Sequence, residues 1–559
     1  FETSKTPKMA GPDDEVRYLR EQKVPELFDE MVSKLTTAKP TDHVQYLYDF
    51  LGQRLESQQT KVVILQVGTT NWQRQGEFSP GSGVLHEAHH ITYNSMPGVK
   101  SFSIYPSSKQ TSDVFDVRIF PVEDGKMPIF TTIPTSSYRF TDMSDAEFVS
   151  YRARLSEAVC KYVDEIEGQA GTIDMAVGHH AFINNMVLVD VNEMREKAGK
   201  PRIKVACFIH GTALKLYQSE VSAGTSRFRS MFAAALPKID KCFAISVQQR
   251  ELMQSLFPDY PAESIIISPN GINQVLFSPD PKLTRQAVLS GLKSAPYEGS
   301  PEASVPLPTT GFDKIVVFCG KFADWKRMDS VLYAAAKWEA KYNHKVLTIM
   351  AGGGPAEQQK VFMDMRETYG TKDAYFIGPQ PHPVLMTLYN IADVGLFPSF
   401  QEPMGLVFLE CMACGTPVIG ADSGGPRDFV KPAVGALVPE VPGVTSWKEA
   451  SQAEKDGFGD RVFETVCKAL DEDWKASKSK ACRDLAVTEY SLQKQCGNLI
   501  KDVLGAYQVP KSAGNEEVRY LQEQKVPELF NDLALKLTTS KPKDAMKFLR
   551  DYFVERVGH

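Results

Sequence analysis

Most of what the sequence says about the fold lies in the stretch Phe397-Pro-Ser-Phe-Gln-Glu-Pro-Met-Gly-Leu-Val-Phe-Leu-Glu-Cys-Met-Ala-Cys-Gly-Thr-Pro-Val-Ile419. An apolar run that ends at Phe397 predicts a buried strand, and a polar loop follows it. Pro403 and Gly405 then open an apolar helix, and the run Pro417–Gly420 predicts the next strand. A strand, a helix and a second strand in succession are typical of a parallel sheet with crossover helices.

The same stretch carries chemistry where the first strand ends. Glu402 lies in the loop and Glu410 lies inside the helix, while the free backbone N–H groups of Gly405, Leu406 and Val407 form an anion site at the helix start. A sugar nucleotide suits this arrangement, because its diphosphate would bind the helix start and its hydroxyl groups would donate to the carboxylates. The spacing of the two glutamates can also arise by chance.

Outward from this stretch, short β-branched runs alternate with helical stretches between Lys61 and about Ala506. A segment rich in Pro, Ser and Gly, Ser294 to Gly311, separates two series of such runs. The predicted strands are Val62–Val67, Ser101–Tyr105, Thr172–Val177, Ile203–Ile209, Cys242–Ser246 and Ser264–Ser268 in the first series, and Lys314–Cys319, Val346–Met350, Ala374–Ile377, Val394–Phe397, Pro417–Gly420 and Ala436–Val438 in the second. Two doubly wound α/β domains follow, and ligands of such sheets bind at the carboxyl ends of the strands. We therefore expect the site in the cleft between the domains.

The first domain offers a glycine-rich segment after its first strand. Gly81 and Gly83 precede a helical pattern, which is a common geometry for backbone N–H groups that approach a phosphate. About thirteen residues separate Val67 from Gly81, so the register of this loop stays open. We expect Gly83 to bind the donor.

Read with its neighbours, Glu402-x7-Glu410 resembles the retaining GT-B glycosyltransferases of family 4 over about 440 residues. Gly320-Lys-Phe-Ala-Asp-Trp-Lys326 is similar to the family's Gly-Arg…Lys element, and Phe208-Ile-His-Gly-Thr212 to its His-Gly-Thr element. Ala351-Gly-Gly-Gly-Pro355 and Ser268-Pro-Asn-Gly-Ile272 resemble two further turns of that family. The resemblance implies a GT-B fold of two Rossmann-like domains that face a cleft.

The resemblance also implies roles for single residues. Lys321 and Lys326 would bind the donor diphosphate, and Lys321 stands where the family has an Arg, so the bidentate fork is lost. Glu402 would orient the sugar and Glu410 the ribose, whereas His210 would lie beside the sugar and assist the reaction. His210 can equally be a strand-end histidine bonded to the backbone.

The implied reaction is transfer of a sugar from a nucleotide diphosphate sugar with retention at the anomeric carbon. UDP-glucose is the expected donor only because it is a common one. The acceptor is unknown. No metal and no cofactor are expected, because lysines and helix starts stabilise the leaving diphosphate. Six histidines in presumed strand-end segments of the first domain keep a zinc site open, with His86 and His90 four residues apart. A pyridoxal-dependent phosphorylase is disfavoured, since we find no lysine in the required context.

A repeat brackets the two domains. Glu15–Phe28 recurs as Glu517–Phe530, and each copy predicts two amphipathic helices that need a partner to bury their apolar faces. The pattern resembles the RIIα-type docking-and-dimerisation hairpin, which implies an amphipathic anchoring helix of a partner protein, a homodimer, and an address in the cytoplasm or the axoneme of a cilium or flagellum. The copies can instead clasp the central body. A scaffold of the axoneme with little or no activity is the alternative function.

These boundaries divide the chain into five parts. They are a docking hairpin (1–58), an acceptor domain (59–293), a linker (294–312), a nucleotide-sugar domain with a crossover helix (313–510) and a second docking hairpin (511–559).

Composition excludes several classes of protein. The 63 basic and 69 acidic residues give a net charge of -6 without a basic stripe, so a nucleic-acid partner is not indicated. No apolar run approaches the roughly 20 residues of a membrane span. Nine scattered cysteines in mostly apolar runs indicate buried thiols. The chain begins with Phe1 and not Met, so a targeting segment stays open.

Overall fold

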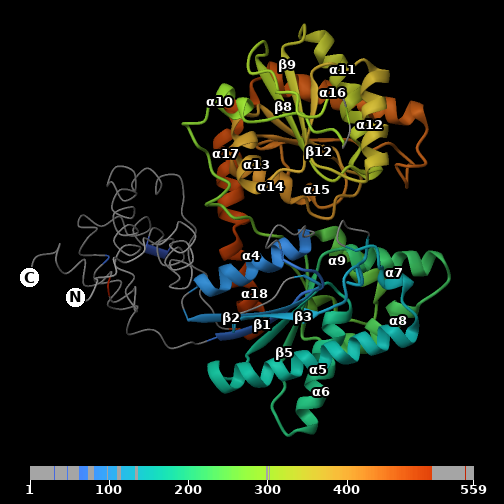
Figure 1. Ribbon diagram of the computed structural model, residues 1–559, viewed down its shortest axis with the longest axis vertical. Coiled ribbons are helices and arrows are strands. Elements are labelled where there is room, and N and C mark those ends of the chain that lie inside the picture. Colours follow the sequence, from blue (N-terminus) through green and yellow to red (C-terminus); the bar gives the residue numbers. More distant parts are fainter. Residues whose placement is uncertain are drawn as a thin grey trace, which may run out of the picture.

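The computed structural model of the protein describes residues 62–72, 81–96, 98–109, 115–131, 136–297, 300 and 302–505, and the single positions 30, 31, 47 and 548. Within these ranges the chain forms two α/β lobes, one above the other in Figure 1. The repeated segments Glu15–Phe28 and Glu517–Phe530, and the docking hairpins predicted from them, lie outside the described residues.

The first lobe is built on a parallel sheet, which has seven strands in the described ranges, in the order β3-β2-β1-β4-β5-β6-β7. The strand order reverses direction between β1 and β4, which is where ligands bind in sheets of this kind. The strands are β1 (Val62–Val67), β2 (Val99–Ser107), β3 (Val117–Pro121), β4 (Met175–His179), β5 (Lys204–Ile209), β6 (Lys241–Ala244) and β7 (Ile265–Ile267).

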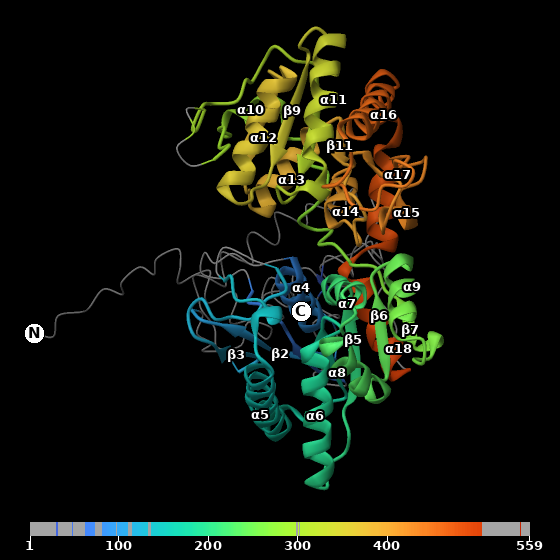
Figure 2. The same cartoon turned by 90° about the vertical axis from the view of Figure 1, so that its right-hand side faces the viewer.

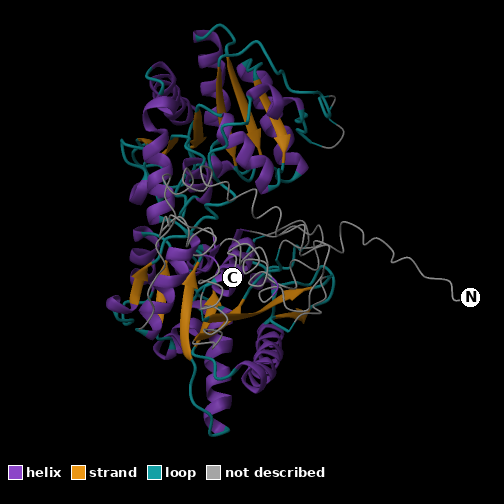
Figure 3. Ribbon diagram, turned by 90° about the vertical axis from the view of Figure 1, so that its left-hand side faces the viewer, coloured by secondary structure: helices purple, strands orange, loops and turns teal. Residues whose placement is uncertain are grey.

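Helices cover both faces of this sheet, as Figure 3 shows with the strands in orange. The α-helices are α4 (Gly81–Ser95), α5 (Asp145–Ala170), α6 (Ile183–Lys197), α7 (Thr212–Ser222), α8 (Arg227–Ala235) and α9 (Val247–Leu256), and 3-10 turns are formed by Phe140–Asp142, Leu236–Lys238 and Ala262–Ser264. α5 begins with a capping box, in which the Ser144 hydroxyl accepts from the Glu147 amide and the Glu147 carboxylate accepts from the Ser144 amide.

The second lobe repeats the plan with a six-stranded parallel sheet among its described residues, in the order β10-β9-β8-β11-β12-β13. Its order reverses between β8 and β11. The strands are β8 (Lys314–Cys319), β9 (Val346–Ala351), β10 (Ala374–Gly378), β11 (Val394–Phe397), β12 (Val418–Ala421) and β13 (Gly435–Val438).

The helices of the second lobe pack on both faces of its sheet. They are α10 (Arg285–Ser290), α11 (Met328–Lys341), α12 (Ala356–Tyr369), α13 (His382–Ile391), α14 (Leu406–Ala413), α15 (Pro426–Phe429), α16 (Gln452–Asp471) and α17 (Trp474–Glu489), with a 3-10 turn at Asp324–Lys326. Figures 1 and 2 show α14 and α15 on the side of this lobe that faces the first one.

A strand forms in every run where the sequence predicts one, with most ends shifted by one to three residues, because most of these runs are apolar and buried on both faces. β1 is buried at every position, and β8 and β11 begin and end at the predicted residues. β3 was not predicted; it is a partly buried edge strand with a polar residue inside it.

The chain crosses between the lobes twice, and the two crossings lie side by side. The Ile272 amide donates to the Tyr490 carbonyl (2.8 Å), and the Leu492 amide donates to the Ile272 carbonyl (3.2 Å). α18 (Leu492–Leu504) then packs on α4 of the first lobe, where Gln495 contacts His89 at 2.9 Å. The last described helix therefore returns to the lobe in which the first described strand lies.

The first crossing joins the second lobe earlier than the segment 294–312 that we expected to be the linker. The Asp280 amide donates to Asn390, and Arg285 on α10 forms an ion pair with Asp393 at 2.7 Å. Both partners belong to the second lobe. The chain is therefore packed on this lobe before residue 294.

The structure also bears on the expectations of buried free thiols and of no membrane-spanning segment. All nine cysteine thiols are free, and seven of them are buried. In the part of the chain that the structure describes, no helix has both the length and the apolar character needed to cross a membrane.

Candidate functional site

Two loops of the second lobe come together where β8 and β11 end. β8 and β11 are neighbours in the sheet, so the loops that follow them leave the same edge. The Phe400 amide donates to the Trp325 carbonyl at 2.7 Å and ties the loops to each other. Residues 320–327 and 399–405 therefore form one surface at the carboxyl ends of the strands.

Lys326 and Glu402 meet on this surface. The Lys326 Nζ lies 2.6 Å from the Glu402 Oε2, and each side chain is only 12% exposed. The family resemblance implied that Lys326 would face the diphosphate and Glu402 the sugar, and in the structure the two side chains bind each other. An ammonium has three N–H donors, so the ion pair leaves donors on Lys326 for a phosphate oxygen.

The start of α14 lies directly after this loop. Gly405 precedes the helix with a φ of 87°, and no side chain caps the first turn. A Cβ at this position would lie 2.6 Å from the ring of Phe408, so glycine is required for both conformation and space. The amides of Leu406 and Val407 have no partner within the helix and can bind an anion.

Glu410 lies one level deeper, on the buried side of α14. The Tyr389 hydroxyl donates to its Oε2 at 3.4 Å. Burial raises the pKa of Glu410 to about 7, and the tyrosine hydrogen bond opposes this shift. The residue is therefore divided between its neutral and charged forms near neutral pH.

The facing edge of the first lobe is lined by histidines. His179 and His210 end β4 and follow β5, and their rings are hydrogen-bonded from Nδ1 to Nε2 at 3.0 Å. The ring of His86 packs on that of His179 and the ring of His180 on that of His210, with centroids 4.4 and 4.5 Å apart. His210 is thus bonded to another side chain and not, as one reading had it, to the backbone.

These histidines are held neutral. Burial lowers the pKa of His179 and His210 well below the usual value, and the neighbouring imidazoles lower both further. Burial alone lowers the pKa of His180 to about 3, and it lowers that of His89 to about 4. The first lobe therefore presents an uncharged, aromatic edge near neutral pH.

Two of the predicted donor-binding residues lie apart from the ion pair. Lys321 is exposed beyond the end of β8. α4 begins at Gly81, so Gly81 and Gly83 lie inside the first turn of the helix and do not precede it. Helical hydrogen bonding thus extends further toward the strand than we predicted, and Gly83 is buried. Within the described part of the chain, no hydrogen bond or ion pair joins Lys321 or Gly83 to Lys326 or Glu402.

The two lobes touch at this level. Gly211, next to His210, has a φ of 87°, and a Cβ there would lie 3.4 Å from the Cβ of Pro403 in the second lobe. The Val247 amide at the start of α9 donates to the Asp428 carboxylate at 3.0 Å. The Glu402 loop and the His210 segment therefore belong to one composite site.

Sequence reasoning missed Lys215, which reaches across the junction. It lies on α7 of the first lobe, and its Nζ is 5.4 Å from the centroid of the Trp325 ring in the second lobe. The available signal was weak: a lysine in the first turns of the helix that follows the His210-Gly-Thr segment.

A second missed residue is Arg327, which directly follows Lys326. It is fully buried with a φ of 54°, and its guanidinium lies over the Trp447 ring at 4.0 Å. Its Nη2 is 2.5 Å from the Glu440 Oε2, the Glu440 Oε1 accepts from the Ser423 hydroxyl (2.5 Å), and the Ser423 Oγ accepts from the Gln401 amide (3.1 Å). This chain of contacts connects the residue after Lys326 with the residue before Glu402.

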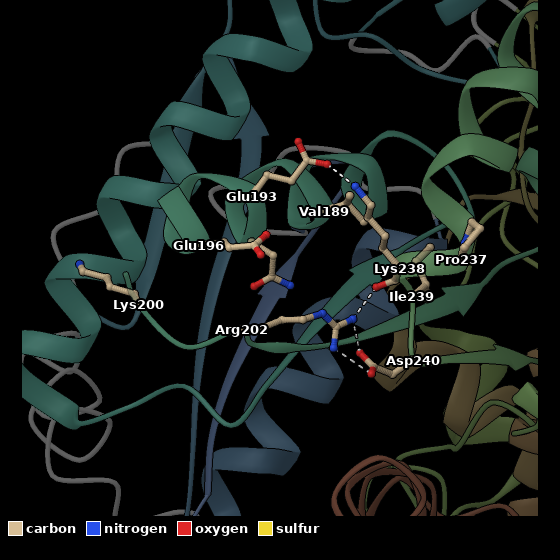
Figure 4. A pocket seen from close by; sticks show the side chains of 10 residues that line it. Val189, Glu193, Glu196, Lys200, Arg202, Pro237, Lys238, Ile239 and Asp240 are labelled. Carbon is tan, nitrogen blue, oxygen red and sulfur yellow. Dashed lines mark hydrogen bonds and ion pairs between the residues drawn. The ribbon is translucent and has the colours of Figure 1, made fainter. Parts of the chain in front are cut away.

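A hollow of about 690 Å³ lies elsewhere, at the amino ends of β5 and β6. Figure 4 shows that four of its charged side chains form two pairs, Lys238 with Glu193 (2.5 Å) and Arg202 with Asp240 (2.8 Å). Because these four charges are matched and the hollow lies away from the carboxyl ends of the strands, it is a weaker candidate for a charged ligand. The junction of the strand ends remains the candidate site.

Residues 302–453 match the family described as Glycosyl transferases group 1. This segment contains Lys321, Lys326, Glu402 and Glu410. Together with the structural comparisons below, the match supports the GT-B glycosyltransferase resemblance, although it covers less than half of the chain.

Among curated proteins, the chain is similar to D-inositol 3-phosphate glycosyltransferases. It is 31% identical to that of Corynebacterium glutamicum over 194 residues, which are 34% of this chain and 43% of the relative. It is 28% identical to that of Kribbella flavida over 238 residues, or 41% and 51% of the two chains. The chain thus spans about half the length of these relatives or less.

Solved structures resemble a larger part of the chain. Sucrose-phosphate synthase from Thermosynechococcus elongatus superposes with a TM-score of 0.55 at 15% identity and covers 80% of this chain and 100% of its own. HepE from Anabaena in complex with UDP-glucose gives a TM-score of 0.51 at 15% identity, with 79% and 100% covered. These likenesses confirm the predicted fold, two Rossmann-like domains in the GT-B arrangement.

Proposed function

We propose that the chain is a glycosyltransferase that transfers a sugar from a nucleoside diphosphate sugar to a hydroxyl group of an acceptor, with retention at the anomeric carbon. One observation carries the proposal: Lys326, Glu402 and the uncapped start of α14 lie together at the carboxyl ends of β8 and β11. They lie within the segment that matches the glycosyltransferase family.

The charges of the site suit the bond that must break. As the bond from the anomeric carbon to the phosphate oxygen breaks, its electron pair stays with the diphosphate, and the sugar becomes cationic. Lys326 and the amides of Leu406 and Val407 would stabilise the diphosphate, with Lys321 adding positive charge nearby. The acceptor oxygen would then bond to the anomeric carbon and pass its proton to the departing phosphate oxygen, which carries the negative charge.

The other site residues would position the sugar and the ribose. Glu402 offers carboxylate oxygens to sugar hydroxyls while it orients Lys326, and Glu410 would accept from the ribose. His210 is neutral and half-buried at the facing edge, and it would contact the sugar from the first lobe. Gly83 would act through the backbone of the first turn of α4.

The donor and the acceptor are proposed by class. UDP-glucose is the first donor to test, since HepE is described in complex with it. The names of the relatives, D-inositol 3-phosphate glycosyltransferase and sucrose-phosphate synthase, make small polyhydroxylated acceptors with a phosphate the first class to screen.

Calorimetry on the full chain tests the proposal. UDP-, GDP- and ADP-sugars are titrated in turn, and the donor that binds is incubated with candidate acceptors while the anomeric configuration of the product is followed by NMR. We expect one nucleoside diphosphate sugar to bind and the product to keep the donor's configuration. Failure of all common donors to bind would overturn the proposal and favour a scaffold without activity.

We further propose that the repeated segments dock the enzyme to an amphipathic helix of a partner protein, at a fixed address such as a ciliary axoneme. The support is the sequence repeat itself. A pull-down with such a helix should succeed for the natural chain and fail after Leu27→Glu combined with Leu529→Glu. Equal capture of the double variant would contradict docking.

A further inference from the structure

Two lysines, one from each lobe, share a single indole ring. The Lys326 Nζ lies 4.3 Å from the centroid of the Trp325 ring, and the Lys215 Nζ lies 5.4 Å from the same centroid. Lys326 and Trp325 belong to the turn that follows β8, whereas Lys215 is carried by α7. The junction of the lobes therefore brings together two ammonium groups that are far apart in the sequence.

Only one of these two cations is neutralised. Glu402 binds Lys326 at 2.6 Å. Among the described residues, no carboxylate forms an ion pair or a hydrogen bond with Lys215. Two ammonium groups beside the same ring repel each other, so the arrangement favours an additional anion between the lobes.

The surroundings of Lys215 agree with this charge balance. Partial burial against the second lobe lowers the pKa of Lys215, Lys326 lowers it further, and Glu402 raises it. The side chain nevertheless keeps access to solvent, so a ligand can reach the ammonium group.

Backbone groups add to the positive potential. α7 begins after Gly211 without a side-chain cap, and Gly211 faces Pro403. α14 begins three residues after Pro403, also without a side-chain cap. Two helix starts, one from each lobe, thus lie near the two lysines, and each carries free N–H groups.

We propose that Lys215 is a binding group for the diphosphate of the donor, supplied by the first lobe and opposite Lys326 of the second. The inference rests on the proposed function and extends it. The leaving group is then held by cations from both lobes, and the second cation is in place only while the lobes touch. Because the diphosphate gains negative charge as the sugar departs, Lys215 binds the transition state more tightly than the intact donor.

The first test measures binding without depending on the identity of the base. Inorganic pyrophosphate, UDP and GDP are titrated into the natural chain and into Lys215→Met, with uridine and guanosine as ligands that lack phosphate. We expect Lys215→Met to weaken diphosphate binding about tenfold, the value of one charge-assisted hydrogen bond, and to leave nucleoside binding unchanged.

Two matched variants separate charge from shape. Lys215→Arg keeps the charge and should stay within about threefold of the natural chain, because a guanidinium can still bind phosphate. Gln218→Met changes an exposed residue of the same helix to the same apolar side chain and should have no effect.

The outcomes are distinct. If the natural chain binds no diphosphate, the proposed function fails together with this inference. If the natural chain binds UDP, GDP or pyrophosphate and Lys215→Met binds it equally well, Lys215 is only a contact between the lobes, and this inference alone fails. Equal loss of nucleoside and diphosphate binding would likewise overturn it.

Discussion

The two strand edges that meet at the junction differ in how their titratable side chains are accommodated. The edge of the second lobe carries charges that are paired, with Lys326 bound to Glu402 and Arg327 bound to Glu440. The edge of the first lobe carries titratable groups that are kept uncharged, and His179, His180 and His210 stack against each other and against aromatic rings.

On the proposed function, this difference would give the two edges different roles in binding the donor. A paired, charged edge can bind a diphosphate with little rearrangement, because the dipoles and charges are already oriented. On the first edge only His210 is partly exposed, and as a neutral imidazole it would offer a hydrogen bond to the sugar on the proposed function. Lys215 is the exception, since it brings a cation from the neutral lobe to the charged one.

The largest expected effect is the loss of stability at acid pH, which arises from the buried histidines of the first lobe. In the unfolded chain a histidine has a pKa near 6.5, whereas the pKa of His89 is about 4 and that of His180 about 3 in the fold. The unfolded state therefore takes up more protons below pH 6.5, and stability is lost as the pH falls from there toward the folded values. The two residues together should remove about 4 kcal/mol of unfolding free energy between pH 6 and pH 4.5.

Urea unfolding at a series of pH values measures this loss. His180→Asn is a suitable variant, because His180 has a φ of 68° and asparagine tolerates that conformation. We expect its stability to fall by about 1.4 kcal/mol less per pH unit in this window than that of the natural chain. Parallel curves would mean that His180 is already protonated in the fold.

Removal of the buried cation should damage the second edge next. Arg327→Met leaves Glu440 partly buried without its partner, and we expect a loss of about 3 kcal/mol in unfolding free energy. Lys480→Met, at an exposed pair with Asp484, is the control and should change it by less than about 0.5 kcal/mol. A loss below about 1 kcal/mol for Arg327→Met would show that the contacts from Glu440 to Gln401 contribute little to the free energy of unfolding.

Donor binding should be the next most sensitive property. Lys326→Ala removes the cation and leaves Glu402 unpaired beside the diphosphate, so we expect affinity for the donor to fall more than tenfold by calorimetry. Lys204→Ala, which removes a lysine at the start of β5 far from the junction, should bind as the natural chain does. Unchanged affinity of Lys326→Ala would place the donor elsewhere.

The smallest expected effect concerns Glu410. The raised pKa of about 7 means that its carboxylate, the better acceptor for ribose hydroxyls, becomes the major form only above neutral pH. Donor affinity should therefore rise a few-fold between pH 6 and pH 8, and Glu410→Gln should remove this rise without a change in fold. A pH profile that is the same for both proteins would separate Glu410 from the ribose.

The sequence predicts the strands well because each is one short buried run. The strand predicted at Cys242–Ser246 ends two residues too late, since β6 ends at Ala244 and Ser246 is the N-cap of α9, where it accepts from the Gln249 amide. The loop and helix of Glu402 and Glu410 form a contiguous segment, so local pattern alone places them beside the helix start.

Lys215 and the Arg327–Glu440 pair could not be found in this way. Lys215 belongs to the site because α7 faces Trp325 across the junction. Arg327 belongs to it because its partner Glu440 lies 113 positions later in the chain. Both depend on packing between distant segments, for which local periodicity carries no information. The same holds for the hydrogen bond between His179 and His210, which joins neighbouring strands.

The paired crossing at Ile272 and Tyr490 has a consequence for the order of the chain. The chain leaves the first lobe and returns to it at one place, where the two connections are hydrogen-bonded side by side. Both ends of the described core, Val62 and Gly505, are attached to the first lobe. The second lobe is therefore an insertion into the first, and the first lobe is complete only once α18 has packed on α4.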